Sequence, residues 1–284
     1  MASLKLGKTN GMPEKPASAK AARQRGKAAP EQHDDADADR SLDTAAAENI
    51  APRISWKRKI GRLFLWAAGG YAAVLTAHLI IFAFAPPVSS MMLGRWFSGQ
   101  PVSRTYVSLD NVAPRMIASV IASEDSQFCR HWGVDFGAVW DVLENSWNDD
   151  EAPTRGASTI TMQVVKNLYF WQLPGYVRKL FEYPTALFVD LIWSKERIME
   201  VYLNIAEWGP DGVIGVEAGA QRAFGRSAKV LTARQASILT TSLPNPIKRN
   251  AAKPSRRQLL VAGVVERRAR SADLPLECFS ENYR

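Results

Sequence analysis

A stretch of 23 residues without a formal charge, LFLWAAGGYAAVLTAHLIIFAFA (63–85), constrains this chain more than any other feature. At 1.5 Å per residue, a helix of this length spans the roughly 30 Å hydrocarbon core of a bilayer. The preceding stretch, RISWKRKIGR (53–62), holds five bases and no acid, and the first base after the apolar run is Arg95. The positive-inside rule then predicts a cytoplasmic N-terminus and a chain that lies outside the cytoplasm from about residue 90.

A cleaved signal peptide is the alternative, because Ala83-Phe84-Ala85 has the small-x-small pattern of a cleavage site. The apolar run is too long for the hydrophobic h-region of a signal peptide, and Pro86 follows directly, so we expect an uncleaved transmembrane helix. The N-terminal part has almost no large apolar side chains, which predicts disorder. The expected order is a disordered cytoplasmic tail (1–52), a basic juxtamembrane segment (53–62), a transmembrane helix (63–85) and a periplasmic domain (90–284).

The net charge of +8 is concentrated near the N-terminus, because residues 1–62 hold 13 Lys and Arg against 8 Asp and Glu. The rest of the chain is only mildly basic and shows no nucleic-acid-binding motif, so we expect no nucleic-acid partner. The two cysteines, Cys129 and Cys278, lack CxxC spacing. We expect two free thiols, with a disulfide as the alternative for a domain outside the cytoplasm.

Helical periodicity dominates the chain after residue 100. In DNVAPRMIASVIASED (110–125), Asp110 or Asn111 is the expected N-cap of a helix with an apolar stripe. SKERIMEVYLNIAEW (194–208) repeats that spacing, and LTARQASILTTSL (231–243) opens with the capping box Thr232-x-x-Gln235. Alternation typical of strands is scarce, so the fold class is mainly α, in one domain.

Two carboxylates, Glu124 and Asp125, end the first of these helices. Ionisation of a carboxyl at a helix C-terminus is unfavourable because it faces the negative end of the dipole. The raised pKa that results suits proton transfer near neutral pH. The alternative is an ordinary solvated helix end.

Two later stretches carry further polar groups. TRGASTITMQVVKNLYF (154–170) resembles a polar loop that leads into a helix and suits sugar hydroxyls and phosphate oxygens, although an N-capped helix alone would explain it. In YVRKLFEYPTALFVDLIW (176–193), Arg178 and Glu182 share a helix face, either as a cleft wall or as a surface ion pair. Pro184 should kink or interrupt this helix.

Taken in order, six stretches resemble the peptidoglycan glycosyltransferases of glycosyltransferase family 51. They are EDSQFCRHWGVD (124–135), GASTITMQVVKN (156–167), RKLFE (178–182), SKERIMEVYLN (194–204), GVIGVEAGAQRAFG (212–225) and LTARQASILTTSLPNP (231–246). The resemblance covers about residues 100–250 and implies a lysozyme-like helical glycosyltransferase domain with a membrane-proximal jaw. The substrate that it implies is lipid II, an undecaprenyl-diphosphate-linked disaccharide-pentapeptide. The chain ends too soon for the transpeptidase domain to which the family is also found fused, so we expect a monofunctional member.

The resemblance also assigns roles. Glu124 should be the general base on the 4-hydroxyl of the acceptor sugar, and Glu182 should assist departure of the diphosphate, directly or through cations. Three cations should hold the diphosphate: Lys166, Arg178 and Lys179. Ser158 and Gln163 should contact the substrate. Four residues should shape the site: Asp125, Phe128, His131 and Asn204. The α-linked donor and β-1,4 product imply a single inverting displacement.

The sequence departs from the family pattern at Ala157, Met162, Asp190 and Gly219, and Pro184 is unexpected. Met162 removes one hydrogen bond to substrate, whereas both glutamates are intact. We expect no required cofactor, with a divalent cation near the diphosphate left open. The expected partners are lipid II, the growing glycan, the inner membrane and proteins of cell division or wall synthesis. A lysozyme-like wall-cleaving enzyme and a catalytically idle scaffold are the competing hypotheses.

Overall fold

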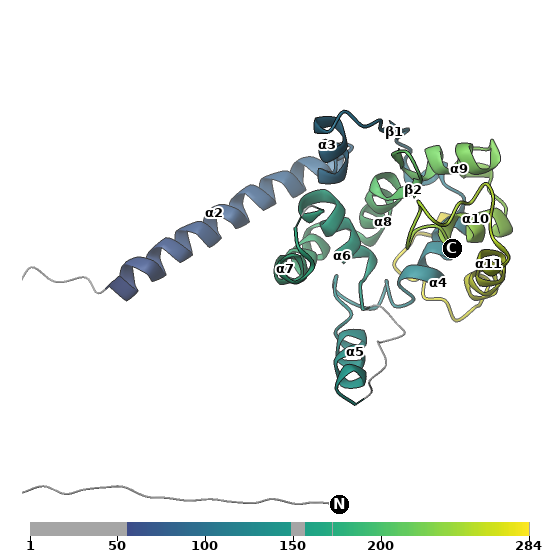
Figure 1. Ribbon diagram of the computed structural model, residues 1–284. Coiled ribbons are helices and arrows are strands. Elements are labelled where there is room, and N and C mark those ends of the chain that lie inside the picture. Colours follow the sequence, from purple (N-terminus) through teal and green to yellow (C-terminus); the bar gives the residue numbers. More distant parts are fainter. Residues whose placement is uncertain (1–55, 149–156, 172, 284) are drawn as a thin grey trace, which may run out of the picture. The chain divides into compact units, whose positions relative to one another are not determined.

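A computed structural model describes residues 56–148, 157–171 and 173–283 of the chain (Figure 1). The predicted tail (1–52) lies outside the described residues. From Leu63 onward the chain forms one compact unit. Its longer helices are α2 (Trp56–Phe84), α3 (Ser90–Phe97), α4 (Pro114–Glu124), α5 (Phe136–Asn148), α6 (Ile160–Val165), α7 (Gly175–Ile192), α8 (Lys195–Ile205), α9 (Val216–Phe224), α10 (Ala233–Thr240) and α11 (Arg256–Ala269). The mainly helical prediction is confirmed.

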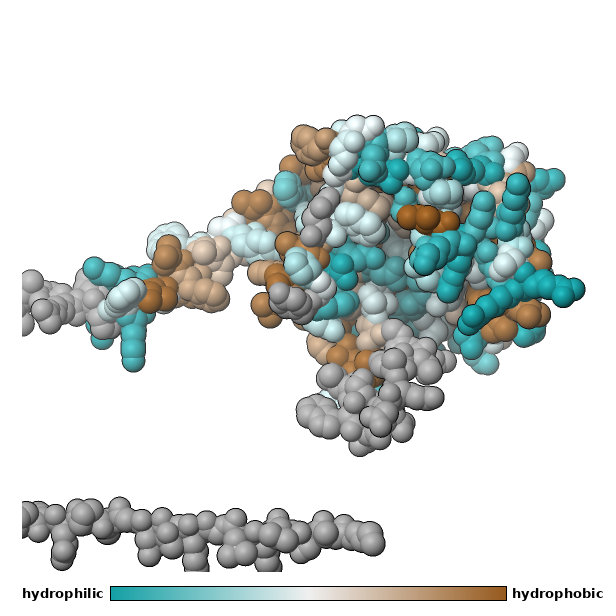
Figure 2. Space-filling model, in the orientation of Figure 1, coloured by the Kyte–Doolittle hydropathy of each residue, from teal (hydrophilic) through white to brown (hydrophobic). Residues whose placement is uncertain are grey.

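Helix α2 is the one described helix that is long and apolar enough to cross a membrane. Figure 2 shows hydrophilic side chains at its start and hydrophobic ones beyond them. Leu63, Phe64 and Trp66 are each at least 70% exposed, which water would disfavour and a bilayer would not. The helix begins seven residues earlier than the predicted span, because the basic residues form its first turns.

The C-terminal end of α2 is held by the start of α8. Leu75 and Leu79 are buried, and the Trp193 indole nitrogen donates a hydrogen bond to the Leu79 carbonyl at 2.8 Å. The Arg197 guanidinium donates to the carbonyls of Phe82 (3.0 Å) and Ala85 (2.8 Å). A helix end has carbonyls without intrahelical partners, and Arg197 satisfies them here. The anchor and the domain are therefore joined by specific contacts.

Helix α4 is the central element, because it packs against α10 and α11 and its middle, Met116–Ala122, is buried throughout. Its predicted N-cap is wrong. The helix begins at Pro114 after Ala113, without a side-chain cap, and Asp110 and Asn111 belong to a separate 3-10 turn, η1 (Leu109–Asn111). Proline fixes φ near the helical value and lacks an N–H, so it fits the first helical position and sets the start.

The remaining helices largely follow their sequence signals. The capping box of Thr232 and Gln235 opens α10, and the apolar stripe of α8 is buried, as predicted. Pro184 does not interrupt α7, which runs for 18 residues. Thr185 and Ala186 beside it are fully or almost fully buried, and this packing offsets the missing backbone hydrogen bond.

Two 3-10 turns, η3 (Ala228–Val230) and η4 (Glu281–Tyr283), and one small sheet complete the domain. The strands β1 (Ser103–Arg104), β2 (Glu207–Gly209) and β3 (Val213–Ile214) lie in the order β1-β3-β2. β1 pairs in parallel with β3, with Ser103 opposite Val213, and β2 pairs antiparallel to β3. The sheet pairs the segment after α3 with the segment between α8 and α9. It carries none of the predicted site residues.

A disulfide joins Cys129 to Cys278, so the expectation of free thiols is wrong. After α11 the chain turns back as a C-terminal segment (271–283) that packs on the loop following α4. Phe279 is buried with its ring 6.1 Å from that of Phe128. The cysteines are 149 positions apart, and only this return of the chain brings them together.

Candidate active site

Glu124 is the last residue of α4, and its side chain is half-buried at the wall of a cleft. The Ser123 hydroxyl donates to one carboxylate oxygen at 3.1 Å, and the Gln163 amide donates to the other at 3.3 Å. Burial raises the pKa of Glu124, whereas these two donors and the charges of Lys166 and Arg249 act in the opposite direction. A carboxylate of this kind can accept a proton from a hydroxyl group near neutral pH.

Gln163 connects this carboxylate to the core. The buried Tyr202 hydroxyl donates to the Gln163 side-chain oxygen at 3.3 Å, which leaves the amide nitrogen to face Glu124. Gln163 comes from α6 and Tyr202 from α8, so two helices set the orientation of one amide. The arrangement holds the Glu124 carboxylate in place before any substrate binds.

Asp125 terminates α4 and braces the loop that follows. It is 8% exposed and accepts hydrogen bonds from the Ile160 backbone N–H at 2.9 Å and from the His131 ring nitrogen Nε2 at 3.0 Å. These contacts join the end of α4, the loop and the start of α6. Through these contacts Asp125 and His131 hold the loop beside Glu124, while their role in shaping the site stays a prediction.

Lys195 fixes the same loop from the start of α8. Its ammonium group donates to the His131 carbonyl at 2.7 Å, pairs with Asp190 at 2.6 Å and lies 4.7 Å from the centre of the Phe128 ring. Asp190 reaches this partner although it is one methylene shorter than the glutamate common in the family. Phe128 itself is fully buried, so its side chain supports the packing of this loop.

A cleft of about 700 Å³ opens beside Glu124. Ser158, Ala157 and Thr159 line one part of it, and α5 and Arg268 line another. Glu124 and Ser158 therefore face one cavity, as the sequence predicts. Gly156, which belongs to the same motif, lies outside the described residues.

A second carboxylate, Glu182, is only 1% exposed and forms two ion pairs. Arg178 approaches one oxygen at 2.8 Å and Lys179 the other at 2.7 Å. Lys166 begins a π-helical turn, η2 (Lys166–Phe170), and its ammonium group lies 5.5 Å from the centre of the Trp171 ring. Burial and the nearby Arg178 lower the pKa of Lys166, whereas Glu182 and Glu124 act to raise it.

These four residues form a cation cluster, defined as Lys166, Arg178 and Lys179 around Glu182. Three bases against one acid leave an excess of positive charge. Such an excess suits a group with two negative charges, such as a diphosphate. Lys166 lies close enough to Glu124 for their charges to interact, which links the cluster to the cleft.

Asn204 lies apart from the cleft. Its amide nitrogen donates to the Val107 and Glu200 carbonyls at 2.8 Å each, and its oxygen accepts from the Val107 N–H at 2.9 Å. It fixes the segment that leads toward α4. Met162 is fully buried, so the side chain that replaces the family's glutamine fills the core.

Three residues near Glu124 were not singled out from sequence. Tyr202 falls within SKERIMEVYLN but was counted only as part of an apolar stripe, and Arg249 and Arg268 follow the last motif considered. A hydroxyl within an apolar stripe is a signal that a buried polar partner exists, and it could have indicated Tyr202. No local signal distinguishes Arg249 or Arg268 from surface arginines.

The fold and the site together define a helical domain with a half-buried carboxylate on a cleft wall beside a cluster of cations. A family model described as Transglycosylase matches residues 90–268. The chain belongs to this transglycosylase family and is a glycosyltransferase. The family resemblance drawn from the motifs is confirmed.

Curated relatives support the same assignment, and each is named "Biosynthetic peptidoglycan transglycosylase". The protein of Rhodopseudomonas palustris (strain HaA2) is 47% identical over 220 residues, covering 78% of this chain and 94% of the relative. That of Brucella suis biovar 1 is 48% identical, covering 69% of this chain and 88% of the relative. That of Agrobacterium fabrum is 49% identical, with 71% and 89% covered.

Proposed function

We propose that this protein polymerises lipid II into β-1,4-linked peptidoglycan strands and releases undecaprenyl diphosphate. The observation that carries the proposal is the position of Glu124, a carboxylate of raised pKa on a cleft wall, within the field of the cation cluster. The names of the relatives point to peptidoglycan as the material that is built.

In the proposed reaction, Glu124 removes the proton from the 4-hydroxyl of the acceptor GlcNAc. The freed oxygen attacks the anomeric carbon of the donor from the side opposite the diphosphate. The bond between that carbon and the diphosphate oxygen breaks, and the leaving group takes the electron pair. One displacement of this kind converts an α-linked donor into a β-linked product, so no covalent enzyme intermediate is needed.

Lys166, Arg178 and Lys179 would stabilise the charge that develops on the leaving diphosphate. Glu182 is buried and paired with two of these cations, so we propose that it acts by orienting them rather than by donating a proton. The reaction as proposed needs no cofactor. Whether a divalent cation assists the diphosphate is tested by chelation during the assay.

We propose that α2 is a single-pass anchor in the inner membrane, with the N-terminus in the cytoplasm and the enzyme domain in the periplasm. The basic residues at the start of α2 support this orientation. The Cys129–Cys278 disulfide supports it independently, because such bonds persist in oxidising compartments. Partner proteins of wall synthesis remain a prediction from the family resemblance.

The test is polymerisation of purified lipid II by the wild type and by the Glu124→Gln and Glu182→Gln variants. We expect glycan strands from the wild type and a loss of roughly 100-fold or more in Glu124→Gln, since general base catalysis contributes about 10²–10⁴-fold. Moenomycin, which mimics the lipid-linked donor, should inhibit the reaction.

Four outcomes would contradict the proposal in different ways. Failure of the wild type to make strands would overturn it, and release of soluble muropeptides from isolated walls would favour the lysozyme-like alternative. Full activity in Glu124→Gln would refute the assignment of the base. An inactive wild type that still recruits wall-synthesis proteins would favour the scaffold.

A further inference from the structure

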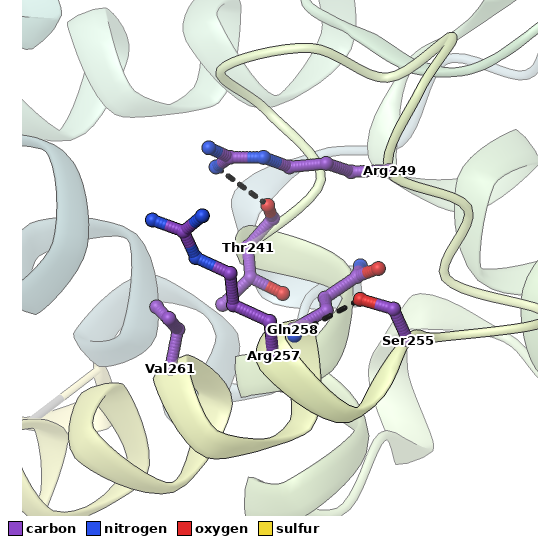
Figure 3. Close-up of a pocket in the computed structure, with 6 residues that line it drawn as sticks. All are labelled: Thr241, Arg249, Ser255, Arg257, Gln258 and Val261. Carbon is purple, nitrogen blue, oxygen red and sulfur yellow. Dashed lines mark hydrogen bonds between the residues drawn. The ribbon is translucent and has the colours of Figure 1, made fainter.

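A second cavity, separate from the cleft, lies between the end of α10 and the first turns of α11. Its volume is about 180 Å³. It is lined by Thr241, Arg249, Ser255, Arg257, Gln258 and Val261 (Figure 3). Sites that enclose a whole small ligand measure roughly 300–1,000 Å³, so this cavity suits a single end group of a larger molecule.

The lining of this cavity is basic and contains no acid. Within the described part of the chain, no ion pair to an acid involves Arg249 or Arg257. The side-chain hydrogen bond described for Arg249 goes to the Thr241 carbonyl at 3.4 Å, and Figure 3 shows the two guanidinium groups ending on the same side of the cavity. Two guanidinium groups that form no described ion pair and share a lining without acids favour an oxyanion.

The other polar groups of the lining already have partners. The Ser255 hydroxyl accepts from the Gln258 backbone N–H at 3.2 Å, and the Gln258 amide donates to the Ser242 hydroxyl at 3.1 Å. These bonds fix the first turn of α11 and leave the arginines as the groups free to bind a ligand. We therefore expect this cavity to select a ligand by its negative charge.

The position of the cavity relates it to the active site. Helices α10 and α11 both pack against α4, and the charge of Arg249 reaches Glu124. Figure 1 shows α6, which leads directly into Lys166, and α7, which carries the rest of the cation cluster, on one side of α4, with α10 and α11 on the other. A substrate held at Glu124 thus has one basic site for its diphosphate and a second basic site on the opposite side.

We propose that Arg249 and Arg257 bind a carboxylate of the peptide stem of the substrate. This inference rests on the proposed function, because it takes the substrate to be a lipid diphosphate disaccharide that bears a peptide. The diphosphate already has three cations of its own, and the remaining anions of such a substrate are the carboxylates of its peptide. A phosphate oxyanion is the other source of the same chemistry, and the test separates the two.

The experiment measures polymerisation with two substrates: lipid II with its pentapeptide, and the same lipid diphosphate disaccharide without the peptide. The variant is Arg257→Gln, since Arg257 is not among the groups that shift the pKa of Glu124. We expect its KM for the peptide-bearing substrate to rise about tenfold, as for loss of one exposed charge-assisted bond. For the peptide-free substrate, the KM of the variant should equal that of the wild type. The wild type itself should have a KM for the peptide-free substrate about tenfold higher than for the peptide-bearing one.

Two further variants make the result specific. Arg256→Gln removes the same charge from the same turn of α11 but not from the cavity lining, so both KM values should stay at the wild-type level. Arg249→Gln should raise KM for the peptide-bearing substrate and, unlike Arg257→Gln, also shift the pH profile of kcat. Thermal melting of each variant checks that it is folded.

The outcomes that overturn the inference differ from those that overturn the proposed function. An equal rise of KM for both substrates in Arg257→Gln would assign the cavity to a phosphate and refute the carboxylate. An unchanged KM in Arg257→Gln, or an effect of Arg256→Gln of the same size, would refute the site. A wild type that polymerises neither substrate would refute the proposed function instead.

Discussion

Breaking the Cys129–Cys278 disulfide should destabilise the domain strongly, because the bond closes a very long loop. The two residues are 149 positions apart. In the chain-entropy model, a loop of this length corresponds to about 5 kcal/mol at 25 °C, and measured values commonly reach about 2–4 kcal/mol. For a domain of this size each kcal/mol shifts Tm by about 2–4 °C, so we expect Tm to fall by roughly 5–15 °C.

The other described contacts between the C-terminal segment and the loop after α4 are non-covalent. The Arg130–Glu277 ion pair, at 3.4 Å, is more than half exposed on both sides and contributes little. The contact of Phe279 with Phe128 is buried and should remain, as should the hydrogen bonds from the Ser280 N–H to Glu196 (2.7 Å) and from the Tyr283 hydroxyl to Asp110. We therefore expect the loss of the bond to loosen the loop that carries Asp125 and His131.

The measurement is thermal unfolding of the full chain in detergent, followed by circular dichroism, with and without a dithiol reductant. The Cys129→Ser/Cys278→Ser double variant should melt with the reduced wild type, and reductant should not change it further. Lipid II polymerisation at raised temperature should fail earlier in both. A double variant that melts within about 2 °C of the oxidised wild type would refute the reasoning, since the loop constraint would then contribute little.

Three further predictions concern Glu124 and the core. Burial raises the folded-state pKa of Glu124, so its contribution to stability is present at low pH and is lost as pH rises through that pKa. Glu124→Gln should then have a higher Tm than the wild type at pH 8, and the difference should vanish below pH ~4, where the free carboxyl is protonated in both states. An unchanged or lower Tm at pH 8 would contradict this. Gln163→Leu removes a hydrogen-bond donor to the ionised Glu124 carboxylate, which should raise the pKa of Glu124 further. The acid limb of the kcat/KM profile should therefore move to higher pH. A shift to lower pH would refute that contact. Gly219→Ala would place a Cβ 2.5 Å from that of Trp208 and should cost about 1–3 kcal/mol of unfolding free energy. In the control Gly175→Ala, the added Cβ meets nothing within 4 Å, so this variant should not be destabilised. Equal urea midpoints for the two variants would show that the Gly219 contact relaxes freely.

Features whose evidence is local in sequence were predicted well. The anchor follows from an uninterrupted apolar run, and the body of α4 and the capping box of α10 follow from patterns within one or two turns. Glu124 was placed at a helix end because the apolar stripe stops there. Where prediction failed locally, as at the start of α4, a proline at the first helical position outweighed the polar residues considered as caps.

Features that depend on distant segments were missed or left open. The free-thiol prediction failed because nothing near Cys129 indicates that residue 278 returns to it. Pro184 was expected to break α7, but the cost of one lost hydrogen bond is offset by burial of its neighbours, which sequence alone does not show. Arg249 carries no motif and gains a role only because α10 and α11 pack on α4.

By itself, the sequence determined the apolar helix near the N-terminus, the helical class and the family, and it singled out the two glutamates as candidates. Each of these is carried by composition, periodicity or an ordered set of short motifs. Only the tertiary structure decided what surrounds the two glutamates. Gln163 and Tyr202 orient Glu124, and two cations pair with Glu182. The tertiary structure also decided the disulfide, which attaches the C-terminal segment to the loop after α4. The physical reason is that pKa and orientation depend on burial and on charges within a few ångströms, and those neighbours come from helices far apart in the chain.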